Sequence, residues 1–376
     1  MHIIGIICEY NPFHNGHLYH IQKIKEIYPQ SLIIVVLSTS FCERGEVSVL
    51  NKWDKTKIAL ENNIDLVIEL PFVFSSQSAD IFSYGAAKLL NELQVDKIIF
   101  GSETNDINKL TNIANQELNN KTYQKYIKEN MKKGYSYPKA IALSKEQLNI
   151  EPIDTPNDIL GISYIKEIII NNYKITPITI KRTNDYHEQD PKTNITSATA
   201  IRNLINNDKD IKKYVPKNIE KYIYKNIDIF PYLKYKINSD INILNTYQTV
   251  DEGIENKLIK HINEVDNLDE LIDKVKSKRF TYNKINRMFI HILTSFTKEE
   301  AKDIDIKYIR LLGFNQKGKE YLNKIKKDLN LNLITSYKNN NYKELAIEKR
   351  VTSIHSILTN DKTLNKKELE KPIYLK

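Results

Sequence analysis

The sequence lacks the features that would mark a membrane protein or a disulfide-stabilised secreted protein. Its 376 residues include only two cysteines, Cys8 and Cys42, which are too few for a disulfide framework and lie in no metal-type cluster. No uncharged apolar run is long enough to cross a bilayer, and no signal-peptide pattern opens the chain. We therefore expect a cytoplasmic protein with no membrane partner.

Glycines are scarce in the second part of the chain, and its basic residues outnumber its acidic ones. Residues 206–376 contain 34 Lys and Arg against 24 Asp and Glu, whereas residues 1–205 contain 22 against 23. Only three of the ten glycines lie beyond Pro216. The basic excess favours a polyanionic partner for the second part. A lysine-rich composition that spreads charge over solvated surfaces would give the same counts, so this alternative stays open.

Strand-like and helix-like segments alternate over the first 205 residues. Strand-like runs cover residues 2–8, 31–38, 64–71, 95–103 and 174–185, and helical spacing covers 15–28, 54–63, 79–93, 155–172 and 196–207. This alternation predicts an α/β fold with a parallel sheet, in which ligands bind at the carboxyl ends of the strands. Beyond residue 205 helical periodicity dominates. We therefore predict an α/β domain over residues 1–205 and a basic, mainly helical domain over residues 206–376.

The first strand leads into a histidine-rich segment, "EYNPFHNGHLYH", at residues 9–20. Pro12 ends the strand, and we expect a helix to begin near His14, with N–H groups and a partial positive charge that would seat a phosphate. His14 and His17 lie one turn apart on one helix face. Gly16 between them would let a flat ligand such as adenine approach the backbone. Two imidazole donors at this place suit the charge that develops on phosphorus during nucleotidyl transfer.

The histidines also have simpler explanations. An isolated H-x-G-H pattern arises by chance, and a single histidine is usually an ordinary surface residue. A zinc site would need a third ligand at fixed spacing, and a nucleophilic triad would need a Ser or Cys elbow; the sequence shows neither. The position directly after an N-terminal strand favours the nucleotide-binding interpretation.

Several blocks of the sequence carry a resemblance to a known family. "EYNPFHNGHLYH" resembles the H-x-G-H signature of the nucleotidylyltransferase superfamily, whose fold is Rossmann-like. More closely, the chain resembles the bacterial tRNA(Met) cytidine acetate ligase family, because further blocks follow in that family's order: "ERGEVSVLNKWDKTKIALENNIDLVIELPF", "SQSADIFSYGAAKLL", "IIFGSE", "PNDILGISYIK", "KRTNDYH", "ITSATAIR" and "KRFTYNKINRMFIHIL". The resemblance implies a Rossmann-like parallel sheet of the nucleotidylyltransferase type beside the second, helical domain.

The resemblance also implies a two-step reaction. Members of the family activate acetate with ATP to give acetyl-adenylate and pyrophosphate, and then acetylate N4 of the wobble cytidine (position 34) of elongator tRNA(Met). Positioning and charge stabilisation would supply the rate of the first step, and exclusion of water would protect the anhydride. Two other classes stay open: a nucleotidylyltransferase that makes a small nucleotide cofactor, and a non-catalytic RNA-binding protein with an ATP fold.

The resemblance assigns site residues position by position. His14 and His17 would be catalytic. The ATP-binding residues would be Ile7, Cys8, Glu9, Tyr10, Asn11, Pro12, Phe13, His14, Asn15, Gly16, His17, Leu18, Tyr19, His20, Gly101, Asn157 and Arg182. Asn157 could equally cap a helix, and Arg182 offers a bidentate donor to phosphate. Ser197 and Thr199 would hold the leaving pyrophosphate at a helix start, which is compatible with ordinary capping by Ser197.

The basic second domain is expected to bind the tRNA, since a domain near neutrality cannot hold a polyanion by itself. The candidate residues there are Lys278, Arg279, Lys284 and Arg287. ATP and acetate are the expected small substrates, and Mg²⁺ is expected with ATP but has no assignable protein ligand. Arg44 and Asp80 are further candidates in matching blocks, whereas Lys52 and Trp53 match the family without an assigned role.

Overall fold

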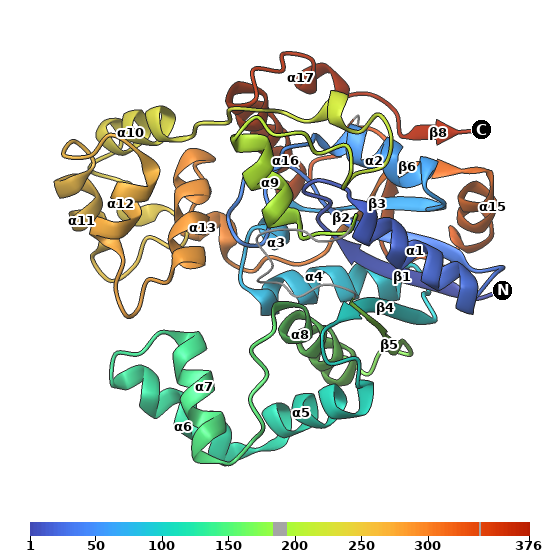
Figure 1. Ribbon diagram of the computed structural model, residues 1–376, viewed down its shortest axis with the longest axis horizontal. Coiled ribbons are helices and arrows are strands. Elements are labelled where there is room, and N and C mark those ends of the chain that lie inside the picture. The colour runs from blue at the N-terminus through green and yellow to red at the C-terminus, as the bar shows by residue number, and fades with distance from the viewer. Residues whose placement is uncertain (183–193, 338–339) are drawn as a thin grey trace.

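The computed structural model describes residues 1–182, 194–337 and 340–376, and it has the predicted α/β fold (Figure 1). These residues form an eight-stranded sheet in the order β5-β4-β1-β2-β3-β6-β7, with β8 paired to β6. The strands are β1 (Ile3–Cys8), β2 (Leu32–Ser38), β3 (Leu66–Leu70), β4 (Lys97–Ser102), β5 (Thr176–Lys181), β6 (Tyr308–Asn315), β7 (Asn332–Ile334) and β8 (Ile373–Leu375).

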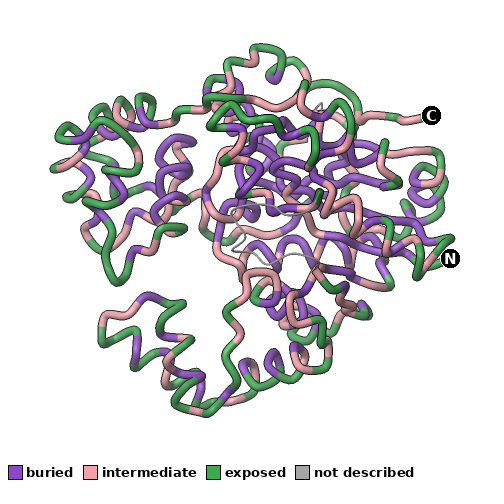
Figure 2. The backbone as a smooth tube through the Cα atoms, in the orientation of Figure 1, coloured by how far each residue is buried: buried purple, intermediate pink, exposed green. Residues whose placement is uncertain are grey.

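Strands β1 to β5 form a parallel core, and the strand order reverses between β1 and β4. Alternate residues of β2 enter two different apolar clusters: Ile34 and Val36 pack on one side of the sheet, and Ile33 and Val35 on the other. The buried residues concentrate around this sheet in Figure 2. Strands that are buried on both faces read as continuous apolar runs, which is why their positions could be predicted and are confirmed.

Helices cover both faces of the sheet. Helices α1, α2 and α9 pack on the face of Ile33, and α3, α4, α8 and α13 pack on the face of Ile34. The helices are α1 (Asn15–Ile27), α2 (Lys52–Glu61), α3 (Phe72–Ser75), α4 (Ala79–Glu92), α5 (Ile107–Asn119), α6 (Lys121–Lys132), α7 (Tyr137–Gln147), α8 (Pro156–Ile170), α9 (Ala198–Asn206), α10 (Phe230–Ser239), α11 (Ile254–His261), α12 (Leu268–Val275), α13 (Tyr282–Leu293), α14 (Lys298–Ala301), α15 (Gln316–Ile325), α16 (Lys343–Leu358) and α17 (Leu364–Lys367). Within the described ranges, no helix is both long and apolar enough to span a bilayer.

The segment from Tyr308 to the C-terminus differs from the predicted helical domain. Strand β6 pairs antiparallel with β3, and β7 and β8 pair with β6. The prediction of a mainly helical domain over all of residues 206–376 is therefore wrong for this segment, which completes the sheet of the first part. The physical reason is that β3 would otherwise be an open edge with unpaired backbone groups. Two of the three added strands have only three residues each, too few for a periodic signal.

A buried charge network fastens this segment to the sheet. The Lys52 ammonium on α2 lies 2.7 Å from Glu69 of β3 and 2.8 Å from Glu368. It also lies 3.3 Å from Glu348 of α16. Arg310 of β6 contacts both Glu69, at 3.0 Å, and Glu368. All five side chains are buried, so Lys52 holds together parts of the chain that are far apart in sequence.

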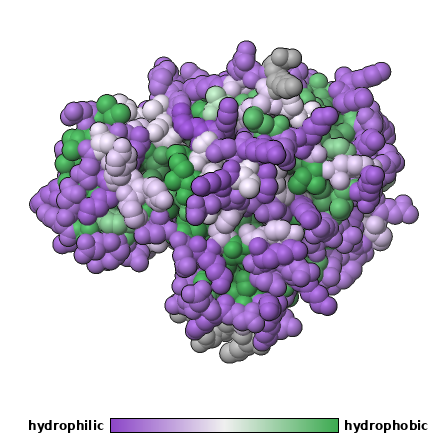
Figure 3. Space-filling model, turned by 90° about the horizontal axis from the view of Figure 1, so that it is seen from above, coloured by the Kyte–Doolittle hydropathy of each residue, from purple (hydrophilic) through white to green (hydrophobic). Residues whose placement is uncertain are grey.

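Two helical lobes project on the same side of the sheet (Figure 1). The α6–α7 lobe comprises residues 121–147, and the α10–α13 lobe comprises residues 230–293. Seen from above, the α10–α13 lobe stands out at the left of the molecule with a largely hydrophilic face (Figure 3). Only this second lobe lies in the part of the chain that was predicted to be helical and basic.

Candidate active site

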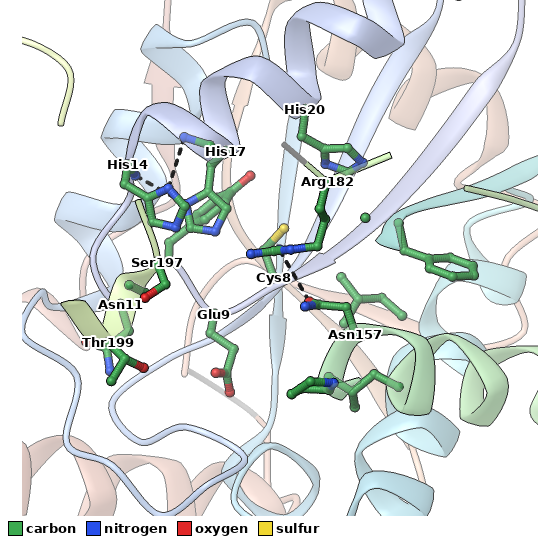
Figure 4. A pocket seen from close by; sticks show the side chains of 18 of the residues that line it. Cys8, Glu9, Asn11, His14, His17, His20, Asn157, Arg182, Ser197 and Thr199 are labelled. Carbon is green, nitrogen blue, oxygen red and sulfur yellow. Dashed lines mark hydrogen bonds between the residues drawn. The ribbon is translucent and has the colours of Figure 1, made fainter. Parts of the chain in front are cut away.

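A cavity of about 250 Å³ opens at the carboxyl ends of the parallel strands, where the strand order reverses between β1 and β4 (Figure 4). Ligands of doubly wound sheets bind at this place because the flanking loops diverge there. The following predicted site residues line it: Ile7, Cys8, Glu9, Tyr10, Asn11, His14, Gly16, His17, Tyr19, His20, Gly101, Asn157, Arg182, Ser197 and Thr199. The structure therefore brings most of the predicted set together around one space.

Four residues of the predicted ATP-binding set are not among the lining residues. Pro12 and Phe13 are buried in the turn beneath the cavity. The side-chain amide of Asn15 donates to two backbone carbonyl oxygens, at 2.8 and 3.0 Å. Leu18 packs against the apolar cluster under α1. These residues hold the loop in place and stay away from the cavity.

The imidazole rings of His14 and His17 stack at the start of α1, with ring centroids 3.8 Å apart. Nδ1 of His14 accepts the backbone N–H of Gly16 at 3.0 Å, and Nδ1 of His17 accepts the backbone N–H of His14 at 3.2 Å. A neutral imidazole carries one proton. Because both Nδ1 atoms are acceptors, the proton of each neutral ring sits on Nε2.

Both rings are neutral at physiological pH. Burial lowers the pKa of His14 to about 3, and the cations of Arg182 and Arg202 act in the same direction. Burial and the neighbouring His14 ring lower the pKa of His17 well below its usual range. The pair therefore presents two Nε2–H donors without a positive charge, and these donors can stabilise charge that develops on a phosphate.

The backbone at the start of α1 differs from the expected phosphate seat. The N–H of Asn15 donates to a backbone carbonyl of residue 214, that of Gly16 to the His14 ring, and that of His17 to the His14 carbonyl. The expectation of free N–H groups is therefore wrong here. The structure adds a second reason for glycine at position 16, since a Cβ there would lie 2.8 Å from the His14 ring. The helix start shapes the histidine pair, and the pair faces the cavity.

A second helix start does offer free N–H groups. Ser197 caps α9 by accepting the N–H of Ala200 at 3.2 Å, which confirms the predicted cap. The N–H groups of Ala198 and Thr199 have no hydrogen-bond partner within the described residues, and both residues line the cavity. Arg202, one turn further on, donates to the Thr199 hydroxyl. The start of α9 is therefore a built anion seat in the same cavity as the histidine pair.

Arg182 and Asn157 form the opposite side of the cavity from the histidine pair (Figure 4). The guanidinium of Arg182 donates to the Asn157 side-chain oxygen at 3.4 Å and lies 3.5 Å from Glu103. Asn157 in turn donates to Glu103 at 2.5 Å. His20 also lines this space, and its buried Nε2 has no partner within the described residues. Donors on both sides thus face a space with room for a ligand.

The cavity also has residues that were not predicted for it: Ile6, Glu43, Glu46, Phe82, Phe100, Pro156, Leu160, Tyr164, Ile180, Lys181, Ile195, Thr196, Ala198 and Arg202. Arg44, a further candidate, lines it as well, whereas Asp80 pairs with Lys166 at 3.3 Å and lies outside. The segment with Glu43 and Glu46 directly follows β2, so the strand-end rule could have found it. Arg202 is one of only seven arginines. The scarcity of arginine in this chain could have marked Arg202 as a candidate site residue.

The acidic segment after β2 links the cavity to α13. Glu43 donates its backbone N–H to the Glu9 carboxylate at 2.7 Å. Its own carboxylate lies 3.2 Å from the Arg287 guanidinium of α13. Burial raises the pKa of Glu43 to about 7, and the Arg287 cation offsets only part of this rise. Burial also raises the pKa of Glu9.

None of the four predicted tRNA-binding residues lines the cavity. Lys278 and Arg279 are exposed in the loop before α13. Lys284 lies over the Phe280 ring, and Arg287 is engaged with Glu43. Most of the "KRTNDYH" block falls in residues 183–193 and so lies outside the described residues.

The two cysteines are not suited to nucleophilic chemistry. Burial raises the pKa of Cys8 to about 12 and that of Cys42 well above its usual range. Both thiols therefore stay protonated at neutral pH, and the thiolate is the reactive form. In the described part of the chain no three His, Cys, Asp or Glu side chains are grouped as a metal site.

Buried histidines predict a loss of stability in mild acid. Burial lowers the pKa of His14 to about 3 and those of His20, His291 and His355 to about 4, and it lowers that of His17 well below its usual range. An unfolded histidine titrates near 6.5. As the pH falls from about 6.5 to 4.5, these histidines become protonated in the unfolded chain but stay neutral in the folded chain. The free energy of unfolding therefore falls.

Three buried carboxyl groups act in the opposite direction. The pKa values of Glu43 and Glu348 rise to about 7, and that of Glu9 is also raised, in each case chiefly by burial. Between pH 6 and pH 5 these three carboxyl groups are protonated in the folded chain and lose their protons on unfolding, whereas the histidines gain protons. The balance is a net uptake of about two protons on unfolding. The free energy of unfolding should then fall by roughly 3 kcal/mol from pH 6 to pH 5. Urea unfolding followed by circular dichroism measures it, and a flat or rising value over this interval would contradict the assignment.

Known proteins resemble the chain over nearly its whole length. The family model described as HIGH Nucleotidyl Transferase matches residues 1–371. A tRNA(Met) cytidine acetate ligase of Caldicellulosiruptor saccharolyticus is 40% identical over 397 residues, with 100% of this chain and 99% of the relative covered. That of Mycoplasmopsis pulmonis is 46% identical over 292 residues, with 77% of this chain and 98% of the relative covered. The crystal structure of Thermotoga maritima TmcAL bound with alpha-thio ATP has a TM-score of 0.88 at 28% identity and covers 100% of both chains. With this cavity and these relatives, the chain belongs to the tRNA(Met) cytidine acetate ligase family of HIGH nucleotidyl transferases.

Proposed function

We propose that the protein is an ATP-dependent ligase that converts acetate and ATP into acetyl-adenylate and pyrophosphate. It then transfers the acetyl group to N4 of the wobble cytidine of elongator tRNA(Met), in the cytoplasm. The names of the relatives support these substrates. The observation that carries the proposal is the neutral histidine pair, which faces the same cavity as the free N–H groups at the start of α9.

In the first step an acetate oxygen attacks the α-phosphorus of ATP, and the bond to pyrophosphate breaks. The Nε2–H groups of His14 and His17 donate to the α-phosphate oxygens as negative charge develops on them. The N–H groups of Ala198 and Thr199 receive the leaving pyrophosphate. Mg²⁺ would enter as part of the ATP complex and would neutralise phosphate charge there.

In the second step N4 of cytidine attacks the carbonyl carbon of acetyl-adenylate. A carbon–nitrogen bond forms, the carbon–oxygen bond to AMP breaks with its electron pair on AMP, and N4 releases a proton. The Glu9 carboxylate at the cavity accepts this proton, which its raised pKa favours. The acetyl group passes directly from the adenylate to the base, and burial raises the pKa of the nearby Cys8 thiol, which disfavours its reactive thiolate form.

Mass spectrometry of tRNA nucleosides tests this function. The purified protein, incubated with ATP, acetate and a tRNA(Met) transcript, should form N4-acetylcytidine, and omission of acetate should abolish it. A transcript with uridine at the wobble position is the matched control. Unmodified tRNA, together with pyrophosphate release driven by a phosphorylated small molecule, would instead support a cofactor-forming nucleotidylyltransferase.

A further inference from the structure

The tips of the two helical lobes meet, although they come from distant parts of the sequence. Gly134 lies in the turn between α6 and α7, and Arg279 lies in the loop between α12 and α13. A Cβ placed on Gly134 would lie 3.9 Å from Nε of Arg279. The lobes face each other on one side of the sheet in Figure 1. One surface therefore runs across both tips.

Both tips are strongly basic. Residues 121–147 of the α6–α7 lobe contain seven lysines against two glutamates, and residues 276–287 contain five Lys and Arg with no acidic residue. Arg279 has one acidic neighbour, Glu252, at 3.0 Å, whereas Lys132, Lys133 and Lys278 are exposed. The basic charge of residues 121–147 does not appear in the net charge of residues 1–205, because acidic residues elsewhere in that part offset its lysines.

Exposed aromatic rings accompany these cations. Tyr137, at the start of α7, is 44% exposed, and Tyr282, at the start of α13, is 50% exposed. Each ring lies three residues from the point where Gly134 and Arg279 approach. Cations combined with exposed rings suit the phosphates and unstacked bases of an RNA loop.

The surface is also connected to the cavity. Helix α13 begins at this surface, and its Arg287 donates to the carbonyl of Glu43 at 3.1 Å and to its carboxylate at 3.2 Å. Glu43 lines the cavity. A loop held at the lobe tips would thus lie at the start of the helix whose Arg287 contacts Glu43, a residue of the cavity lining.

We propose that the tips of both lobes form one binding surface for the anticodon loop of the acceptor RNA, with Lys132, Lys133 and Tyr137 on one side and Lys278, Arg279 and Tyr282 on the other. This inference rests on the proposed function. The charge counts predicted an RNA interface only in residues 206–376. The inference adds the α6–α7 lobe to that interface.

Charge reversal on each lobe tests the inference. The variants are K132E/K133E on the α6–α7 lobe and K278E/R279E on the α10–α13 lobe, with K326E/K327E on the distant end of helix α15 as the matched control of exposed lysines. Filter binding of a tRNA(Met) transcript should show at least tenfold weaker affinity for each lobe variant and no change for the control. The slope of log affinity against log salt should also become shallower, by about 0.7 for each phosphate of the single-stranded loop that the variant no longer neutralises.

Acetate-dependent ATP–pyrophosphate exchange, measured on every variant, reports the ATP site separately. The inference is overturned if K132E/K133E binds tRNA as tightly as the control, whatever K278E/R279E does. If a charge-reversal variant fails to fold, the milder K132A/K133A is measured, and it should still weaken binding several-fold. If the unaltered protein binds tRNA but shows no acetate-dependent exchange, the proposed function fails while the surface stands.

Discussion

Replacing His17 with alanine should lower acetate-dependent ATP–pyrophosphate exchange by about 100-fold or more. The variant loses one Nε2–H donor to the α-phosphate, and loss of a single donor to developing charge typically costs this much. His14→Ala should have a similar effect and should also release the N–H of Gly16, which the His14 ring now accepts. Exchange of labelled pyrophosphate into ATP measures both variants.

Two controls separate this effect from a general loss of structure. His2→Ala alters an exposed histidine outside the cavity and should leave exchange unchanged. His17→Asn keeps a side-chain N–H donor and should recover part of the rate. Exchange within about fivefold of normal in both alanine variants would exclude the pair from the reaction.

Replacing Lys52 with methionine should lower the free energy of unfolding by about 3–5 kcal/mol at pH 8, because it leaves buried carboxylates without their cation. Lys52 contacts Glu69, Glu348 and Glu368. Without it, Arg310 would remain beside Glu69 and Glu368, and Glu348 would lose its cation. The loss should be smaller at pH 6. The pKa of Glu348 is already raised to about 7, so this carboxyl takes up a proton there and loses its need for a cation.

Urea unfolding at the two pH values measures this prediction. Lys326→Met, on an exposed lysine at the end of α15, is the matched control and should change stability by less than about 0.5 kcal/mol. Adding Glu348→Gln to Lys52→Met should recover part of the loss at pH 8. A loss below about 1 kcal/mol for Lys52→Met would show that the network is not a main link between the C-terminal segment and the sheet.

The parallel core and the histidine pair could be predicted because their signals are local. Continuous apolar runs mark the buried strands, and the spacing of His14 and His17 places both rings on one helix face. The antiparallel strand β6 could not be predicted, since its place is set by pairing with β3, more than 200 residues earlier. The same holds for the buried role of Lys52, whose carboxylate partners come from three separate elements.

The chemistry of the site depends on contacts that a pattern does not encode. The sequence indicates a helix start beside His14, but only the fold shows that its N–H groups are already engaged and that α9 supplies the free ones. Charge counts over long segments likewise hid the lysines of the α6–α7 lobe. At the start of α1, the N–H of Asn15 is engaged by a residue about 200 positions away, and the two lobes likewise approach from distant parts of the chain.

A crystal structure with acetate and an ATP analogue that cannot be cleaved at the α-phosphorus tests the central claim most directly. The account predicts the α-phosphate within hydrogen-bond distance of Nε2 of both His14 and His17, with the outer phosphates at the N–H groups of Ala198 and Thr199. A nucleotide bound elsewhere, or bound here with both Nε2 atoms turned away from its phosphates, would contradict it.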